Sequence, residues 1–356
     1  MATPTADAPA PVPADKLQRF IARILEAVDI PPADAANVAE LMTRADLIGA
    51  DGHGVFRLPQ YTRRIRNRGI NVRPNIRLLN EKPAMALVDG DNGMGHLVMR
   101  FAAQTAVKKA RKAGVAWVGV RHSNHAGPAS LYASMPLAED MIGLYFAVGN
   151  ANHLPPWGGI DMLLSTNPLA VAVPTDKEPP IVLDMATTVA AYGKVKTKAQ
   201  RGETMPEGWM IDRQGKPLTD PKRADEGFLV PIGGYKGYGL ALVIGLLAGT
   251  LNGAAMARET VDFNKDEKTV TNTGQAIMAI DISSFGPADE FKRKVDDVAR
   301  QMRNSARLPG VERIWLPGEQ SHAKRQDRTA NGIPLPAPLR RQLDALATEL
   351  KVEPLA

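Results

Sequence analysis

The sequence predicts an α/β protein with one sheet-bearing region and a second, largely helical region. The chain has 356 residues, which is long enough for about two domains at roughly 150 residues each. Hydrophobic residues make up 44% of it, so a large core can form. Short β-branched runs alternate with helical periodicity in the middle of the chain, whereas both ends are mainly helical.

The N-terminal region is predicted to form a helical domain over residues 15–83. Its first apolar residues recur at a spacing that places them on one face of a helix: Leu17, Phe20, Ile21, Ile24 and Leu25. Proline pairs and glycines separate three predicted helices, over 16–28, 33–48 and 58–68. The first 14 residues are rich in alanine and proline, and we expect a disordered leader there.

The middle of the chain is predicted to form an α/β domain over residues 84–283. Apolar, β-branched runs bounded by turn residues predict strands over 85–88, 115–120, 141–148, 169–173, 181–184 and 276–282. Helices are predicted over 95–113 and 240–250, a loop-rich segment over 196–230 and an exposed loop over 262–273. Helices over 291–305 and 336–350 would pack back on the N-terminal helices, so residues 284–356 would join 15–83 in one discontinuous domain.

Composition excludes several function classes. Cysteine is absent, which rules out disulfides, thiolate catalysis and iron–sulfur clusters. The net charge is +6, but the basic residues are dispersed and aromatics make up only 5%, so we expect no nucleic-acid partner. No apolar run approaches the ~18–20 residues of a membrane span, and no signal peptide is evident. The expected location is the cytoplasm.

A glycine-rich segment around one lysine predicts an anion site. Residues 231–240 read Pro-Ile-Gly-Gly-Tyr-Lys-Gly-Tyr-Gly-Leu and precede an apolar run. Glycines expose backbone N–H groups, a helix start adds partial positive charge, and Lys236 adds a full charge. The segment matches neither the phosphate loop G-x-x-x-x-G-K-[ST] nor the dinucleotide fingerprint G-x-G-x-x-G.

His53 and Arg57 form the first candidate catalytic pair. His53 lies between glycines at a predicted helix end, and Arg57 follows four residues later, on the same face if a helix resumes. Histidine exchanges protons near neutral pH, and arginine binds a carboxylate through two hydrogen bonds. The pair suits a 2-oxo or 2-hydroxy acid. The alternative is a structural histidine bonded to a turn carbonyl.

Several strand ends carry small polar residues. His122 and His125 follow one predicted strand, where α/β proteins place ligand-contacting residues, and without a third ligand nearby we expect no metal. Asn150, the Thr166-Asn167-Pro168 segment and the Asp184-Met185-Ala186 segment lie at other strand ends. Each could contact a ribose or phosphate, or could be a plain turn or helix cap.

Taken together, these segments resemble one family, the type-2 malate/L-lactate dehydrogenases. That family also includes ureidoglycolate and sulfolactate dehydrogenases, diketogulonate reductase and Δ1-piperideine-2-carboxylate reductase. The motifs occur in order over residues 16–350: Gly-Ala-Asp-Gly-His-Gly-Val (49–55), Ser-Asn-His-Ala-Gly (123–127), Pro-Trp-Gly-Gly (156–159), Thr-Asn-Pro (166–168), Leu-Asp-Met-Ala-Thr (183–187), Pro-Glu-Gly-Trp (206–209), Gly-Gly-Tyr-Lys-Gly-Tyr-Gly-Leu (233–240) and Pro-Gly-Glu (317–319).

The resemblance implies an NAD- or NADP-dependent oxidoreductase whose cofactor-binding, mixed-sheet domain is not of the Rossmann type. It also implies a homodimer or higher homo-oligomer and a small carboxylate substrate. By resemblance, His53 is the proton donor or acceptor, Arg57 and Thr166 bind substrate, and His125 is the catalytic base of the ureidoglycolate branch. The positions that match cofactor contacts are Asn124, His125, Asn150, Asp184, Met185, Ala186, Lys236, Gly318 and Glu319.

One position departs from the family pattern. The family commonly has serine directly before the first histidine, and this chain has Gly52 there. A hydroxyl that could orient the His53 imidazole is therefore absent.

The predicted reaction is hydride transfer between a nicotinamide and C2 of a 2-oxo or 2-hydroxy acid, with the imidazolium form of His53 as the acid. Reduction of cyclic imino acids, such as Δ1-pyrroline- or Δ1-piperideine-2-carboxylate, is the alternative. A ligand-binding sensor that retains the fold is the non-enzyme alternative. The sequence does not distinguish NAD from NADP.

Overall fold

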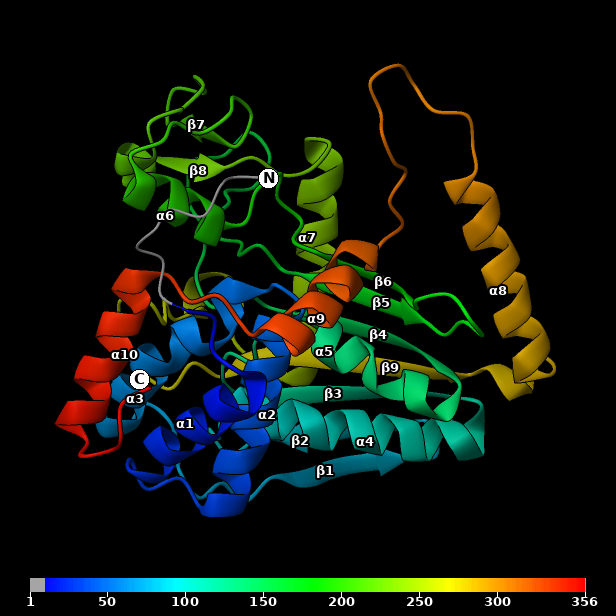
Figure 1. Ribbon diagram of the computed structural model, residues 1–356, viewed down its shortest axis with the longest axis horizontal. Helices are drawn as coiled ribbons and strands as arrows, with labels where there is room; N and C mark the ends of the chain where they lie inside the picture. The colour runs from blue at the N-terminus through cyan, green and yellow to red at the C-terminus, as the bar shows by residue number, and fades with distance from the viewer. Residues whose placement is uncertain (1–9, 356) are drawn as a thin grey trace.

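A mixed seven-stranded sheet forms the centre of the molecule (Figure 1). The structure is a computed structural model that describes residues 10–355. The strand order is β1-β2-β3-β9-β4-β5-β6; β2 and β3 pair in parallel, and every other neighbouring pair is antiparallel. The strands are β1 (Arg77–Lys82), β2 (Met85–Asp89), β3 (Val115–Ser123), β4 (Met141–Ala147), β5 (Leu169–Val173), β6 (Ile181–Met185) and β9 (Thr273–Asp281).

The sheet core is built from small and β-branched side chains. Helix α4 (Gly95–Ala113) packs on β3 and β9 through alanines, and the short α5 (Ser130–Ala133) lies beside β4. Small residues allow close helix–sheet contact, so α4 is buried along one whole face. Strand β1 was not predicted, and it forms an edge of this sheet although it lies before the expected domain boundary at residue 83.

Helices from both ends of the chain share a second core. This helical layer contains α1 (Ala14–Glu26), α2 (Pro32–Leu47), α3 (Leu58–Arg66), α9 (Glu319–Asn331) and α10 (Ala337–Glu349), and one buried apolar cluster joins residues 12–70 to residues 333–355. Backbone bonds between Val12 and Ile333, at 2.9 and 2.8 Å, lock the two ends together. The leader expected over residues 1–14 is therefore too long at its C-terminal end, and its first nine residues lie outside the described part.

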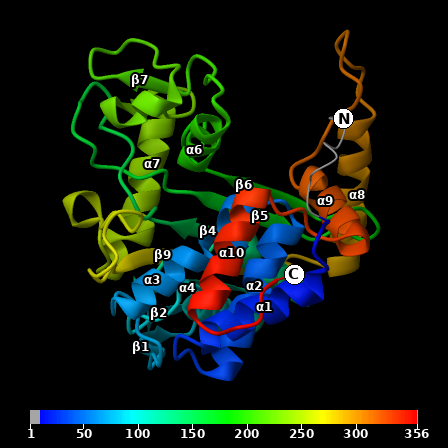
Figure 2. The ribbon, with the colours of Figure 1, turned by 60° about the vertical axis from the view of Figure 1, so that its left-hand side comes forward.

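The segment expected to be loop-rich, 196–230, instead carries a small folded unit (Figure 2). It holds most of α6 (Tyr192–Arg201), and β7 (Met210–Asp212) and β8 (Gly227–Leu229) pair as a hairpin. Apolar side chains from this unit pack with α7 (Tyr235–Ala248) in a third buried cluster. The strands were missed because each has only three residues, too few for a period-2 pattern to register.

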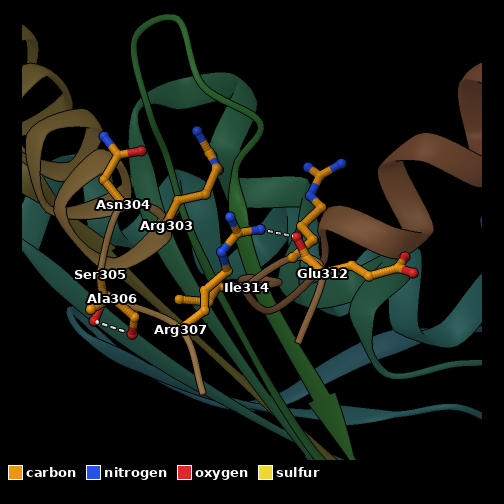
Figure 3. A pocket seen from close by; sticks show the side chains of 8 residues that line it. Arg303, Asn304, Ser305, Ala306, Arg307, Glu312 and Ile314 are labelled. Carbon is orange, nitrogen blue, oxygen red and sulfur yellow. Dashed lines mark hydrogen bonds between the residues drawn. The ribbon is translucent and has the colours of Figure 1, made fainter. Parts of the chain in front are cut away.

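Helix α8 (Ala288–Arg303) and the extended segment 304–316 form an arm that projects from the body (Figures 1 and 2). The arm is anchored at the β5–β6 turn, where the Asp296 carboxylate accepts backbone N–H bonds from Asp176 (3.1 Å) and Lys177 (2.9 Å). A cavity of about 510 Å³ opens inside the arm, with Arg303, Arg307 and Glu312 among its lining residues (Figure 3).

Within residues 10–355, no helix is both long and apolar enough to cross a bilayer. The longest, α4, has 19 residues and carries basic residues in its last turn.

Candidate active site

A short loop after α2 holds His53 in place. Residues 51–53 and 55–57 form two 3-10 turns, η1 (Asp51–His53) and η2 (Val55–Arg57), on either side of Gly54. The buried Asp46 carboxylate accepts the Val55 N–H at 2.8 Å. A Cβ at Gly54 would lie 2.0 Å from that carboxylate, so only glycine fits. From α9, Arg328 pairs with Asp51 and so ties the C-terminal helices to this loop.

His53 belongs to a hydrogen-bonded chain of rings. His53 Nδ1 lies 3.3 Å from His125 Nε2, and His125 Nδ1 lies 2.5 Å from the Tyr61 hydroxyl. The two imidazole planes differ by only 13°, and since the contact has hydrogen-bond geometry the rings lie side by side in nearly one plane. Phe263 stacks on the His125 ring, with centroids 4.9 Å apart and planes 12° apart.

Burial controls the protonation of this chain. Burial, and after it the nearby Arg57 cation, lowers the pKa of His53 to about 4. Burial and then His53 hold the pKa of His125 well below its usual value, and burial raises the pKa of Tyr61. All three groups are therefore neutral at pH 7 in the free protein. Burial therefore disfavours the imidazolium form of His53 that the sequence predicted as the acid.

Arg57 reaches the same site with one side of its guanidinium free. Its Nε donates to the Gly52 carbonyl at 2.9 Å, and its Nη1 donates to Gln60 (2.7 Å) and Asn264 (3.2 Å). Nη2 donates no hydrogen bond within residues 10–355. Burial lowers the pKa of Arg57, but the guanidinium stays charged at any physiological pH. The fixed cation with an open Nη2 can bind a carboxylate.

Asn124 and Asn150 lie beside the ring chain, at the ends of β3 and β4. The Asn150 backbone carbonyl accepts the Phe263 N–H at 3.0 Å, and its side-chain amide donates to Thr273 at 2.6 Å. Thr273 bonds Thr271 at 3.0 Å, which in turn donates to Asn124 at 3.1 Å. The Asn124 amide also donates to Asn92 and Gly93, so protein groups already satisfy this side chain.

The other predicted contacts lie at the same end of the sheet, where β5 begins and β6 ends. Thr166, before β5, accepts Thr187 N–H at 2.9 Å through its carbonyl, which joins the start of β5 to the end of β6. Asp184 in β6 accepts the Ser130 N–H at 2.9 Å; burial raises its pKa, although solvent still reaches the side chain. Met185 and Ala186 follow it, half-buried.

Gly318 and Glu319 occupy a different place, against the outer edge of β6. Pro317 accepts the Val182 N–H at 3.0 Å, and Gly318 has the positive φ of +90° that glycine tolerates. The Glu319 side chain is 6% exposed and binds Arg303 at 2.7 Å, which anchors the arm. Figure 3 shows Arg303 among the side chains that line the arm cavity, and no residue of the ring chain lines it.

Lys236 lies in the first turn of α7, not before the helix as expected. Gly233 and Gly234 precede the helix with φ of +58° and +66°, which turns the chain sharply into it. Lys236 is exposed and has no hydrogen bond or ion pair within the described residues. Asn167 fixes the helix against the sheet by donating to the Ala241 carbonyl at 2.8 Å. The start of a helix and an exposed lysine together suit a phosphate.

The sequence did not identify three residues of the site: Tyr61, Phe263 and Asn264. Tyr61 follows Arg57 by four residues, a helical spacing that could have signalled it. Phe263 lies in a segment predicted to be an exposed loop, and it is only 4% exposed because its ring covers His125. Nothing in the sequence links residue 263 to residue 125.

The remaining histidines lie outside the chain of bonds. His96 is fully buried, edge-on to Tyr61 at 5.5 Å between centroids, and its ring nitrogens have no partner in the described part. His122 bonds Asp89 at 3.1 Å, and His153 stacks on Tyr192 at 4.2 Å.

Known proteins resemble this chain over nearly its whole length, in both sequence and fold. The family described as malate/L-lactate dehydrogenase matches residues 12–344. The chain belongs to that family. It is 39% identical to malate dehydrogenase of Pyrococcus horikoshii over 353 residues, which cover 97% of this chain and 96% of the relative. The solved structure of malate dehydrogenase from P. horikoshii OT3 superposes with a TM-score of 0.90, covering 99% of each chain at 35% identity.

Two further relatives show how wide the family is. Ureidoglycolate dehydrogenase (NAD(+)) of Escherichia coli K12 is 32% identical over 299 residues, covering 84% of this chain and 85% of the relative. The crystal structure of Δ1-piperideine-2-carboxylate reductase from Pseudomonas syringae superposes with a TM-score of 0.83 at 29% identity, covering 95% of this chain and 100% of the other. This member of the malate/L-lactate dehydrogenase family is therefore an oxidoreductase acting on small hydroxy acids, and a nicotinamide is the cofactor that the family supports.

Proposed function

We propose that the protein transfers hydride between a nicotinamide and C2 of a small 2-hydroxy or 2-oxo acid, with His53 exchanging the proton and Arg57 holding the carboxylate. One observation carries the proposal: a hydrogen-bonded pair of neutral histidines lies next to an arginine with an open Nη2. Carboxylate binding by Arg57 would place the adjacent C2 oxygen near His53.

The cofactor would occupy the sheet edge and the start of α7. Lys236 and the N–H groups after Gly234 would hold phosphate, and the strand ends at Asn150 and at residues 184–186 would contact the remainder of the dinucleotide. The site fits such a group because a Cβ at Gly239 would meet no other atom within 4 Å, while one at Gly233 would meet only Lys236, at 3.9 Å. The bound nicotinamide supplies the hydride, and the protein supplies orientation and the proton.

Arg57 would contribute mainly to binding. Its two occupied nitrogens fix the plane of the guanidinium, so a carboxylate meets a preorganised cation. Thr166, half-buried at the start of β5, would be a second substrate contact.

Reduction of a cyclic imino acid is the second candidate. The solved reductase from P. syringae shares the fold, and the same arginine could bind the carboxylate of such a substrate. Gly52 does not discriminate between the candidate functions, because its only effect is to leave out a side chain next to His53.

Oxidation of NADH and of NADPH against pyruvate, oxaloacetate and the two cyclic imino acids tests the proposal. We expect turnover with at least one 2-oxo acid, and a clear preference for one cofactor. Turnover with cyclic imines alone would replace the proposal by the second candidate. Cofactor binding without turnover on the whole panel would favour a ligand-binding sensor.

A further inference from the structure

The geometry points to Tyr61 as a positioning residue that, through His125, sets His53 as a neutral Nε2–H donor and feeds it a proton. This inference rests on the proposed function for its chemistry, but the arrangement of hydrogens can be tested without turnover.

The direction of the bonds follows from one backbone group. The Gly127 N–H, which can only donate, points at His125 Nδ1 across a long 3.4 Å. His125 Nδ1 is therefore an acceptor, and the Tyr61 hydroxyl, 2.5 Å away, must also donate to it. The proton of neutral His125 then sits on Nε2 and is donated to His53 Nδ1. The remaining proton of His53 is on Nε2.

The chain solves a chemical problem of this site. A neutral imidazole cannot give up its Nε2 proton unless its Nδ1 gains one, because the imidazolate is far too basic. With a His53 pKa of about 4, the imidazolium form would be present in only about one molecule in a thousand at pH 7. A donor on the Nδ1 side removes the need for the cation.

The proton balance closes within the three residues. As hydride reaches C2, the Nε2 proton of His53 passes to the substrate oxygen, the Nε2 proton of His125 passes to His53 Nδ1, and the Tyr61 proton passes to His125 Nδ1. The negative charge that would have stayed on the oxygen ends on the Tyr61 phenolate. The Arg57 cation attracts it, and this attraction lowers the pKa of Tyr61 against the effect of burial. Solvent protonates His53 Nε2 after product leaves, and the chain reverses.

The charged and titratable groups around the chain are few, so its pH response can be assigned. They come from four helical elements and the loop after β3: His53 from η1, Arg57 from η2, His96 and Arg100 from α4, Tyr132 from α5, and His125 from the loop. Burial lowers the pKa of His96 to about 3, and Arg100 is bound to Glu40 at 2.7 Å. His96 therefore stays neutral between pH 6 and 9.

The test compares the pH dependence of reduction in the wild type, Tyr61→Phe and Tyr132→Phe. Tyr132 is the matched control, because its buried hydroxyl donates to the Ala126 carbonyl and takes no part in the chain. We expect kcat of the wild type and of Tyr132→Phe to stay level from pH 6 to 9. Tyr61→Phe must use the His53 cation, so its kcat should fall about tenfold per pH unit over that range. A level profile in Tyr61→Phe would overturn the inference.

Nitrogen-15 NMR of the histidine side chains in the free wild-type protein gives the second readout. We expect the Nε2–H tautomer at both His53 and His125. A proton on Nδ1 of either ring overturns the inference even if no substrate is ever turned over. Failure of the whole substrate panel, with the expected tautomers present, would reject the proposed function and leave the hydrogen arrangement standing.

Discussion

The ring chain around His53 and the start of α7 solve opposite problems. Around His53, hydrogen bonds link His53, His125 and Tyr61 to one another, and burial keeps the three groups neutral. At α7, Lys236 is exposed and makes no hydrogen bond or ion pair within residues 10–355, and Gly233 before it is also exposed. A group that moves a proton needs a fixed, dry setting, whereas a group that holds a phosphate needs donors that remain free.

Removal of His53 should have the largest effect. We expect His53→Ala to lower turnover with the accepted 2-oxo acid by roughly 10²–10⁴, because the proton donor to the substrate oxygen is lost. Initial rates at saturating NADH or NADPH measure this, with His322→Ala in α9 as the matched histidine control. Near-full rates in His53→Ala would show that the region around His53 does not transfer the proton.

The buried region around His53 should also affect how the free energy of unfolding depends on pH, through the carboxyl group of Asp46. Burial raises the pKa of Asp46 to about 8, against an ordinary value of 3.8. Between these values the unfolded chain releases a proton that the folded protein keeps, so this carboxyl favours folding fully below pH 4, and its contribution falls as pH rises to about 8. The slope approaches about 1.4 kcal/mol per pH unit.

Asp46→Asn should remove that slope. Its free energy of unfolding, measured by urea denaturation at pH 5, 6, 7 and 8, should lose the decline that the wild type shows. Parallel pH profiles for the two proteins would contradict the buried, protonated state of Asp46. Asp29→Asn, which changes an exposed carboxylate after α1, is the control.

Loss of the free lysine should weaken cofactor binding and little else. We expect Lys236→Ala to raise the Kd for NADH or NADPH about tenfold, or about 1.4 kcal/mol, and to reduce its dependence on salt. Fluorescence titration measures both, with the exposed Lys222→Ala as control. An unchanged Kd would show that Lys236 at the start of α7 does not bind the cofactor.

The smallest effect should come from restoring the serine that the family commonly has. A Cβ at Gly52 would meet no other atom within 4 Å, so Gly52→Ser should fold with a stability within about 0.5 kcal/mol of the wild type. Thermal denaturation checks this, and KM values over the substrate panel show whether the hydroxyl changes selectivity. A large loss of stability would mean that the space beside His53 is needed by the fold.

Long elements with a clear period were predictable. The helix over 95–113 and the strand over 169–173 coincide with α4 and β5, because each carries an uninterrupted apolar pattern and a turn residue at its end. Strand β1 and helix α9 were missed, since both are polar along most of their length. Their positions depend on pairing with β2 and on Arg328 contacts that no local pattern encodes.

The sequence alone determined the α/β class, the family and the residues His53, Arg57 and Lys236 as chemical candidates. Those conclusions depend on residue types and their order, which the sequence states directly. Only the tertiary structure brought His125, Tyr61 and Phe263 together around His53, across up to 210 positions of chain. It also decided that His53 is neutral, because the protonation of a histidine depends on burial and on neighbours that are distant in sequence.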